Sequence, residues 1–136
     1  MQYTVDYFIK KFEAIPETLW CVENIEKDGR HCALGHCGGW PHESKESTAL
    51  AKVLVKYYEL TSLDLPKNHR DEIDYAEVVY NINDFDSMFS DLGATPKQRI
   101  LAALYDIKKM QEPKVKEIIR YVAVHETISE METILN

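Results

Sequence analysis

Apolar and polar residues alternate with the period of a helix in two places in the first half of the chain. Between residues 4 and 14 the apolar side chains stand three and four positions apart, which is the spacing of one helical face, and Thr4 is placed to act as the N-cap. The same spacing returns over residues 45–60, where Ser44 is the candidate cap. We therefore expect a helix in each stretch.

The second half of the chain contains three more helical patterns. Residues 87–92 predict a short helix. Thr95 then opens a longer one, because proline and glutamine at the first and third helical positions are typical of a helix start, and this helix must stop near Pro113. A last helix is expected from Lys114.

A β-hairpin is predicted between the first two helices. Residues 21–25 alternate between apolar and polar side chains as a strand does, and Asp28-Gly29 is typical of a two-residue hairpin turn. Such a turn pairs Lys27 with Arg30. Continued along both strands, the same register places Ile25 opposite Cys32 and Cys21 opposite His36.

Residues 75–82 fit two kinds of secondary structure. The run Val78-Val79-Tyr80 favours a strand, whereas Ile73, Ala76 and Tyr80 also form a helical stripe. Of the two, we expect the strand.

Together these elements predict a mostly helical α+β fold, in which a short N-terminal hairpin packs against four or five helices. We expect a single globular domain over residues 1–136. Residues 1–112 form its core, and residues 113–136 are a C-terminal helical extension that is a candidate surface for homo-oligomers.

Composition limits the classes of function. The 136 residues include 16 Lys and Arg against 23 Asp and Glu, a formal net charge of −7. This balance argues against direct nucleic-acid binding, which needs a clustered excess of basic residues. No apolar run approaches the roughly 18 residues of a membrane span, and the N-terminus lacks a signal-peptide pattern, so we expect a cytoplasmic protein without a membrane partner.

Most of the net charge lies in residues 64–91, which contain eight acidic and two basic residues. Such a segment is suited to meeting a basic surface on another protein, although a solvated face without a partner is the more common origin of a charge run. The candidate partner-binding residues are Asp71, Glu72, Asp74, Glu77, Asp84, Asp86 and Asp91.

Histidine and cysteine are concentrated between His31 and His42. Tetrahedral zinc needs thiolate and imidazole ligands that converge, so one hypothesis is a structural zinc site. Packing is the competing interpretation, in which no cofactor is needed, because the sequence has no Cys-x2-Cys pair and buried cysteines commonly act as small hydrophobic residues. The candidate ligands are Cys21, Cys32, His36 and Cys37, with His42 as an alternative fourth.

The same residues also allow a cysteine-dependent hydrolase or transferase. Cys32 or Cys21 beside His36 would give an imidazole-activated thiolate, and Asn83 or Asp84 would orient the imidazole. The alternative for Asn83-Asp84 is a turn at the end of a strand. Neither a phosphate-binding loop nor a dinucleotide-binding glycine pattern occurs in the sequence.

Six short segments stand in a distinctive order along the chain: Trp20-Cys21, Asp28-Gly29-Arg30, Cys32-Ala33-Leu34-Gly35, Asn83-Asp84, Thr95-Pro96 and Leu101-Ala102-Ala103-Leu104. In this order they resemble a family of small uncharacterised bacterial and phage-borne proteins. That family has a Trp followed by Cys-Ala-Leu-Gly, then Asn-Asp, then a Leu-Ala-Ala-Leu helix that starts with Thr-Pro. The resemblance implies no activity and no catalytic residue. It implies a context of phage and mobile-element genes, where compact acidic proteins often block a host factor.

Taken together, these features favour a non-enzymatic protein of the phage type that inhibits a host protein through an acidic surface, for example a nucleic-acid-handling defence complex. The alternatives are the Cys-His enzyme, a small structural zinc module, and a protein that binds a nucleotide without a recognisable motif.

Overall fold

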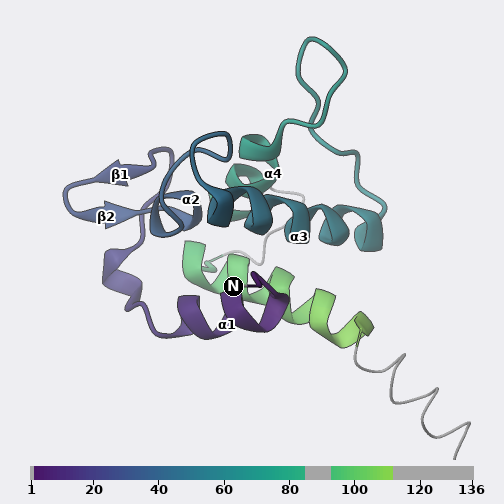
Figure 1. The fold of residues 1–136 in the computed structure, drawn as a ribbon. Helices are drawn as coiled ribbons and strands as arrows, with labels where there is room; N and C mark the ends of the chain where they lie inside the picture. The colour runs from purple at the N-terminus through teal and green to yellow at the C-terminus, as the bar shows by residue number, and fades with distance from the viewer. Residues whose placement is uncertain (1, 85–92, 112–136) are drawn as a thin grey trace, which may run out of the picture.

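The structure is a computed structural model that describes residues 2–84 and 93–111 (Figure 1). The last helix in the described part of the chain spans residues 96–111. The expected mostly helical α+β fold with an N-terminal hairpin is confirmed. The other elements, in order, are α1 (Val5–Glu13), the 3-10 helix η1 (Glu17–Leu19), β1 (Glu26–Lys27), β2 (Arg30–His31), α2 (Ala33–His36), α3 (Lys45–Thr61) and α4 (Tyr75–Asn83).

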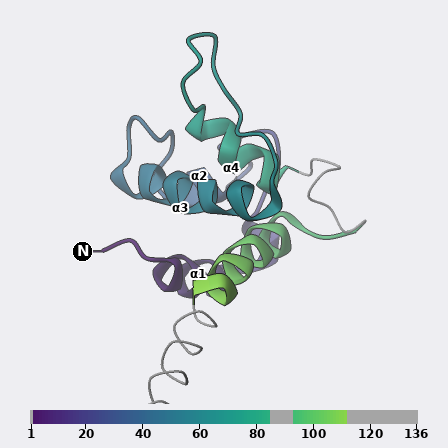
Figure 2. The same ribbon diagram turned by 90° about the vertical axis from the view of Figure 1, so that its right-hand side faces the viewer.

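Helix α3 runs through the middle of the fold. Figures 1 and 2 show α4 on one side of it and α1 with the helix at 96–111 on the other, and Figure 1 shows the hairpin and α2 near one end. In the described chain no helix has both the length and the apolar character needed to cross a membrane. The largest fully buried side chains of the shared core include Phe8, Phe12, Leu34, Leu50, Leu54, Ile82, Ile100, Leu104 and Ile107.

Side-chain caps begin the helices where the sequence predicts them. Thr4 and Ser44 each accept a hydrogen bond from the backbone N–H three residues later, at 3.1 and 3.2 Å. Thr95 and Gln98 form a reciprocal capping box, in which each side chain accepts from the other residue's backbone N–H, at 3.1 and 2.9 Å. These three helix starts are confirmed.

The strand expected over residues 75–82 is wrong, because this segment is helix α4. Asp74 caps the helix by accepting from the Glu77 N–H at 3.2 Å. Val78, Val79 and Ile82 then fall on one face and are buried, with the Tyr58 hydroxyl of α3 donating to the Val78 carbonyl at 3.0 Å. Burial of this face against α3 outweighs the intrinsic preference of two valines for a strand.

The hairpin is partly as predicted. Its turn and the pair Lys27–Arg30 are confirmed, and the Cys32 N–H donates to the Ile25 carbonyl at 3.2 Å. The strand predicted over residues 21–25 is wrong, as is the pairing of Cys21 with His36: Cys21 instead donates its N–H to the His31 carbonyl at 3.0 Å. Glu23 breaks the strand, since its φ of 65° is left-handed, and α2 begins at Ala33.

Two predicted elements lie outside the described residues. They are the short helix at 87–92 and the C-terminal helix from Lys114, which includes the proposed oligomer surface.

Gly35 allows α2 to lie directly against the hairpin. A Cβ at this position would stand 2.2 Å from the Ile25 carbonyl oxygen and 2.9 Å from the His31 Cβ. Both distances are shorter than van der Waals contact, and the nearer atom belongs to the backbone. Any side chain here must therefore push α2 and the hairpin apart.

We expect Gly35→Ala to lower the free energy of unfolding by about 2 kcal/mol, because overpacking a tight contact costs this much. A glycine-to-alanine change inside an unobstructed helix normally stabilises by about 0.5–1 kcal/mol, so the sign of the effect is diagnostic. Urea denaturation measures it. Gly29→Asn is the control, because Gly29 has open space around it and asparagine tolerates its φ of 78°. Equal or greater stability of Gly35→Ala would contradict the contact.

Candidate functional site

The three cysteines are buried and not joined by disulfides. Cys21 and Cys32 lie in the same region, near the Asp84 carboxylate, and burial raises the pKa of both thiols. The Cys21 thiol contacts the Asn24 and Arg30 carbonyls at 3.3 and 3.6 Å. Both thiols are therefore held in the protonated form at neutral pH.

Cys37 occupies a different environment, near Lys11 and Glu46. Its side chain is buried, and burial raises the pKa of the Cys37 thiol well above the pKa of an exposed cysteine. Its carbonyl accepts the Ser44 hydroxyl at 2.6 Å, so this residue helps to fix the start of α3.

Among the described residues, the His36 imidazole contacts Leu19, Trp20 and His31, and not the thiol of Cys21 or Cys32. Its Nε2 lies 3.0 Å from the Leu19 carbonyl, which can only accept, so Nε2 carries the proton. The ring packs against Trp20 and His31, with centroid distances of 4.8 and 5.3 Å. Burial and the neighbouring His31 lower the His36 pKa to about 4, which leaves the imidazole neutral at pH 7.

Within residues 2–84 and 93–111, no three His, Cys, Asp or Glu side chains are grouped so that they could hold a metal ion. The predicted ligands Cys21, Cys32, His36 and Cys37 are thus not brought to one point. His42, the alternative ligand, lies with its side chain 77% exposed, 3.5 Å from the Glu43 carboxylate.

Asn83 is the polar residue around which the buried segments meet. Its Oδ1 accepts the Ala33 N–H at 3.1 Å, and its Nδ2 donates to the Cys21 carbonyl at 3.0 Å. Nδ2 also lies 2.7 Å from the Asp84 carboxylate, which in turn accepts the Glu23 N–H at 2.8 Å. Asn83 and Asp84 therefore orient backbone segments and not the His36 ring.

Arg99 joins the helix at 96–111 to the same place, the end of α4 around Asn83. It is 8% exposed, and its guanidinium donates to the Ile82 carbonyl at 3.2 Å, to the Asn83 carbonyl at 3.2 and 2.7 Å, and to the Ala94 carbonyl. These acceptors lie at the end of α4 and just before the helix at 96–111. Arg99 thereby closes the C-terminal end of α4, whose carbonyls lack helical partners.

Comparisons with protein-family models, with curated proteins and with solved structures found no match to this chain. The resemblance to a phage-borne family stays a prediction from the sequence.

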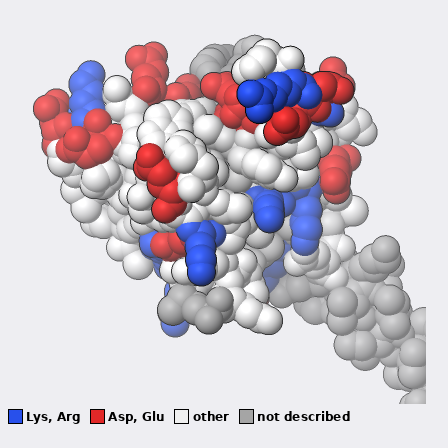
Figure 3. Space-filling model, turned by 45° about the horizontal axis from the view of Figure 1, so that its top comes forward, with Lys and Arg blue, Asp and Glu red and all other residues white. Residues whose placement is uncertain are grey.

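The predicted acidic residues separate into two groups. Asp71, Glu72 and Glu77 are exposed. Asp74 and Asp84 are half-buried and serve as the α4 cap and as the acceptor for the Glu23 N–H. Figure 3 shows the acidic side chains of one face in separate groups with basic ones among them. The remaining two candidates, Asp86 and Asp91, lie outside the described residues.

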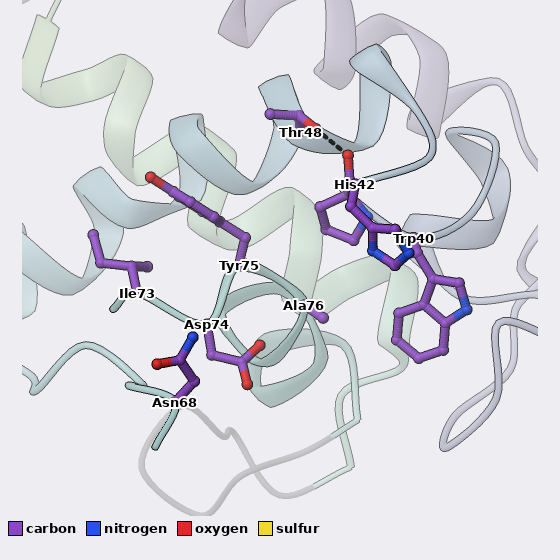
Figure 4. Close-up of a pocket in the computed structure, with 9 residues that line it drawn as sticks. Trp40, His42, Thr48, Asn68, Ile73, Asp74, Tyr75 and Ala76 are labelled. Atoms are coloured by element: carbon purple, nitrogen blue, oxygen red, sulfur yellow. Dashed lines mark hydrogen bonds between the residues drawn. The ribbon is translucent and has the colours of Figure 1, made fainter. Parts of the chain in front are cut away.

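A pocket of about 430 Å³ opens beside the start of α4. In Figure 4, Trp40 and His42 stand on one side of it and Asn68 and Asp74 on the other, with Ala76 between them. The sequence does not reveal this pocket, because its walls come from two loops and from the first turns of α3 and α4, which no periodicity connects. The full lining is Trp40, Pro41, His42, Thr48, Asn68, Ile73, Asp74, Tyr75 and Ala76.

We expect Asn83→Ala to lower the free energy of unfolding by about 3 kcal/mol, because it leaves the buried Ala33 N–H and Cys21 carbonyl without partners. Chemical denaturation measures this loss. Asn81→Ala is the matched control, since Asn81 is half-buried on the same helix, and it should change stability by less than about 0.5 kcal/mol. If both variants lose a similar amount of unfolding free energy, the hydrogen bonds of Asn83 do not hold these segments together.

Iodoacetamide should modify none of the three thiols appreciably in the native protein at pH 7.5, and all of them in urea. The thiolate is the reacting form, and burial disfavours it here. Mass spectrometry of the modified peptides against time measures each cysteine separately. Alkylation of native Cys32 at the rate of a free thiol would contradict this expectation and would favour the Cys-His enzyme.

Proposed function

We propose that this protein is a non-enzymatic binding protein of the phage or mobile-element type, which acts in the cytoplasm by inhibiting a host protein through exposed carboxylates. The observation that carries the proposal is the loop between α3 and α4, residues 62–74, which we call the acidic loop. It extends from the helical body (Figures 1 and 2) and contains the exposed side chains of Asp71 and Glu72. The partner surface would be basic, and direct contact with nucleic acid is not expected.

The loop is ordered by its own hydrogen bonds. The Asn68 side chain accepts the Arg70 and Glu72 N–H groups at 2.9 and 3.1 Å, and the Asn68 N–H donates to the Glu72 carbonyl at 2.8 Å. Lys67 stands 3.9 Å from the Asp71 carboxylate, whose side chain is 91% exposed. Such an exposed pair is weak, so Asp71 can exchange Lys67 for a partner's cation at little cost.

The state of the cysteine and histidine side chains supports a binding role over the Cys-His alternative. An activated pair needs a thiolate beside an imidazolium. Here burial raises the pKa of Cys32 and lowers that of His36, so both groups are neutral at pH 7. A structural zinc module has no such support from the described residues, in which no three of the predicted ligands are grouped to hold a metal ion.

The test is a pull-down from bacterial lysate with immobilised wild-type protein and a charge-reversed variant, Asp71→Lys with Glu72→Lys. The control, Glu59→Lys with Asp106→Lys, makes the same change in net charge at exposed positions on two helices outside the loop. We expect wild type and control to retain the same protein, and the variant to lose it by about tenfold or more at low salt. Mass spectrometry quantifies the captured protein.

Salt supplies an internal check, because attraction between exposed charges weakens as ionic strength rises. Capture by the wild type should fall with added salt. If the double reversal captures the same protein as well as the wild type does, the acidic loop is not the binding surface.

A further inference from the structure

The geometry points to the pocket beside α4 as the site that receives an arginine side chain of a basic partner; this inference rests on the proposed function and specifies its contact. The pocket of about 430 Å³ falls in the size range of sites that enclose a small ligand. It lies directly beside the acidic loop, because Asn68, Ile73 and Asp74 belong both to the loop region and to the pocket wall.

The charge of the lining selects a cation. No Lys or Arg lines the pocket, and Asp74 is the acidic side chain that does. The Asp74 carboxylate accepts the Glu77 N–H through Oδ1 at 3.2 Å. No other donor among the described residues contacts it, so Oδ2 remains able to accept. Because this carboxylate already caps α4, the helix N-terminus is not left open for a phosphate or another anion.

The aromatic wall selects a flat cation. Trp40 is 41% exposed although it is a large apolar side chain, and its ring packs against Tyr80 with centroids 5.9 Å apart. Tyr80 therefore supports one side of the indole, while part of the Trp40 surface stays open to solvent. An arginine guanidinium stacks on such a ring and donates to a carboxylate in its own plane, whereas a lysine ammonium offers only a point charge.

The pocket is also pre-organised. The Thr48 hydroxyl has one proton to share between the Pro41 carbonyl and the Ser44 carbonyl, and these contacts tie the Trp40 loop to α3. On the opposite wall the Asp74 N–H donates to the Pro66 carbonyl at 2.8 Å. A ligand therefore does not have to order these walls on binding, which reduces the entropic cost of association.

The experiment is an NMR titration of the full-length 15N-labelled chain with N-acetyl-argininamide and, separately, with the neutral isostere N-acetyl-citrullinamide. We expect argininamide to shift the backbone amides of residues 40–42 and 73–76 in a saturable way, and citrullinamide to leave them unchanged. Asp74→Asn should weaken the response by about fivefold or more, because asparagine still caps α4 but carries no charge. Asp64→Asn, an exposed loop position outside the lining, is the control and should bind as the wild type does.

Three results would overturn the inference: equal shifts from citrullinamide, no saturable shift at these amides, or saturation of the same amides by adenosine monophosphate without a response to argininamide. The outcome is separable from that of the pull-down. Suppose that argininamide binding depends on Asp74 but that the Asp71→Lys, Glu72→Lys variant still captures the partner. This pair of results would support the pocket and reject the acidic loop. The reverse pattern would reject the pocket alone.

Discussion

The described fold depends on one buried side chain, the carboxamide of Asn83. Through it the end of α4 binds the backbone of Cys21, which follows η1, and of Ala33, which begins α2. A four-residue helix such as α2 has no stability of its own, because helix nucleation is unfavourable. Its place against α4 therefore requires partners from outside, and Asn83 supplies one by accepting the Ala33 N–H.

The same centre explains why the cysteine and histidine cluster of the sequence is not a cluster of functional groups in space. Asn83 fixes the backbones of Cys21 and Ala33, and the Cys21 and Cys32 side chains are buried next to these points. The turn of α2 carries His36 around to Trp20 and Leu19. Burial then moves the thiol and imidazole pKa values in opposite directions. Both shifts stabilise the neutral forms, which suits packing and opposes nucleophilic chemistry.

The sequence predicts what short-range chemistry determines. The caps at Thr4, Ser44 and Thr95 and the Asp28-Gly29 turn depend on residues within three positions of one another, and all of them are confirmed. The strand expected over residues 75–82 failed for the opposite reason. Its valines have a local preference for strands, but the burial of one helical face against α3 decides their conformation, and that contact is not local.

The candidate site shows the same division. Residues 64–91 could be recognised as acidic from composition alone, yet nothing in the sequence separates Asp84, which is half-buried on the Glu23 N–H, from the exposed Asp71. The pocket could not be predicted, because Trp40 and Asp74 are brought together only when α4 packs on α3.

The acidic residues differ in what binding a partner would cost. Both oxygens of the Asp84 carboxylate already accept a hydrogen bond, one from the Glu23 N–H and the other from the Asn83 side-chain amide. Asp84 can therefore turn to a partner only by leaving one of these donors without its acceptor. Asp71 and Glu72 carry no such obligation, and Asn68 holds their loop in place before any partner arrives. Asp74 combines both properties, since one oxygen caps α4 and the other faces no donor among the described residues. Recognition of the proposed partner would therefore cost least where the loop and the pocket meet, because the backbone there is already ordered and one oxygen of Asp74 is still able to accept.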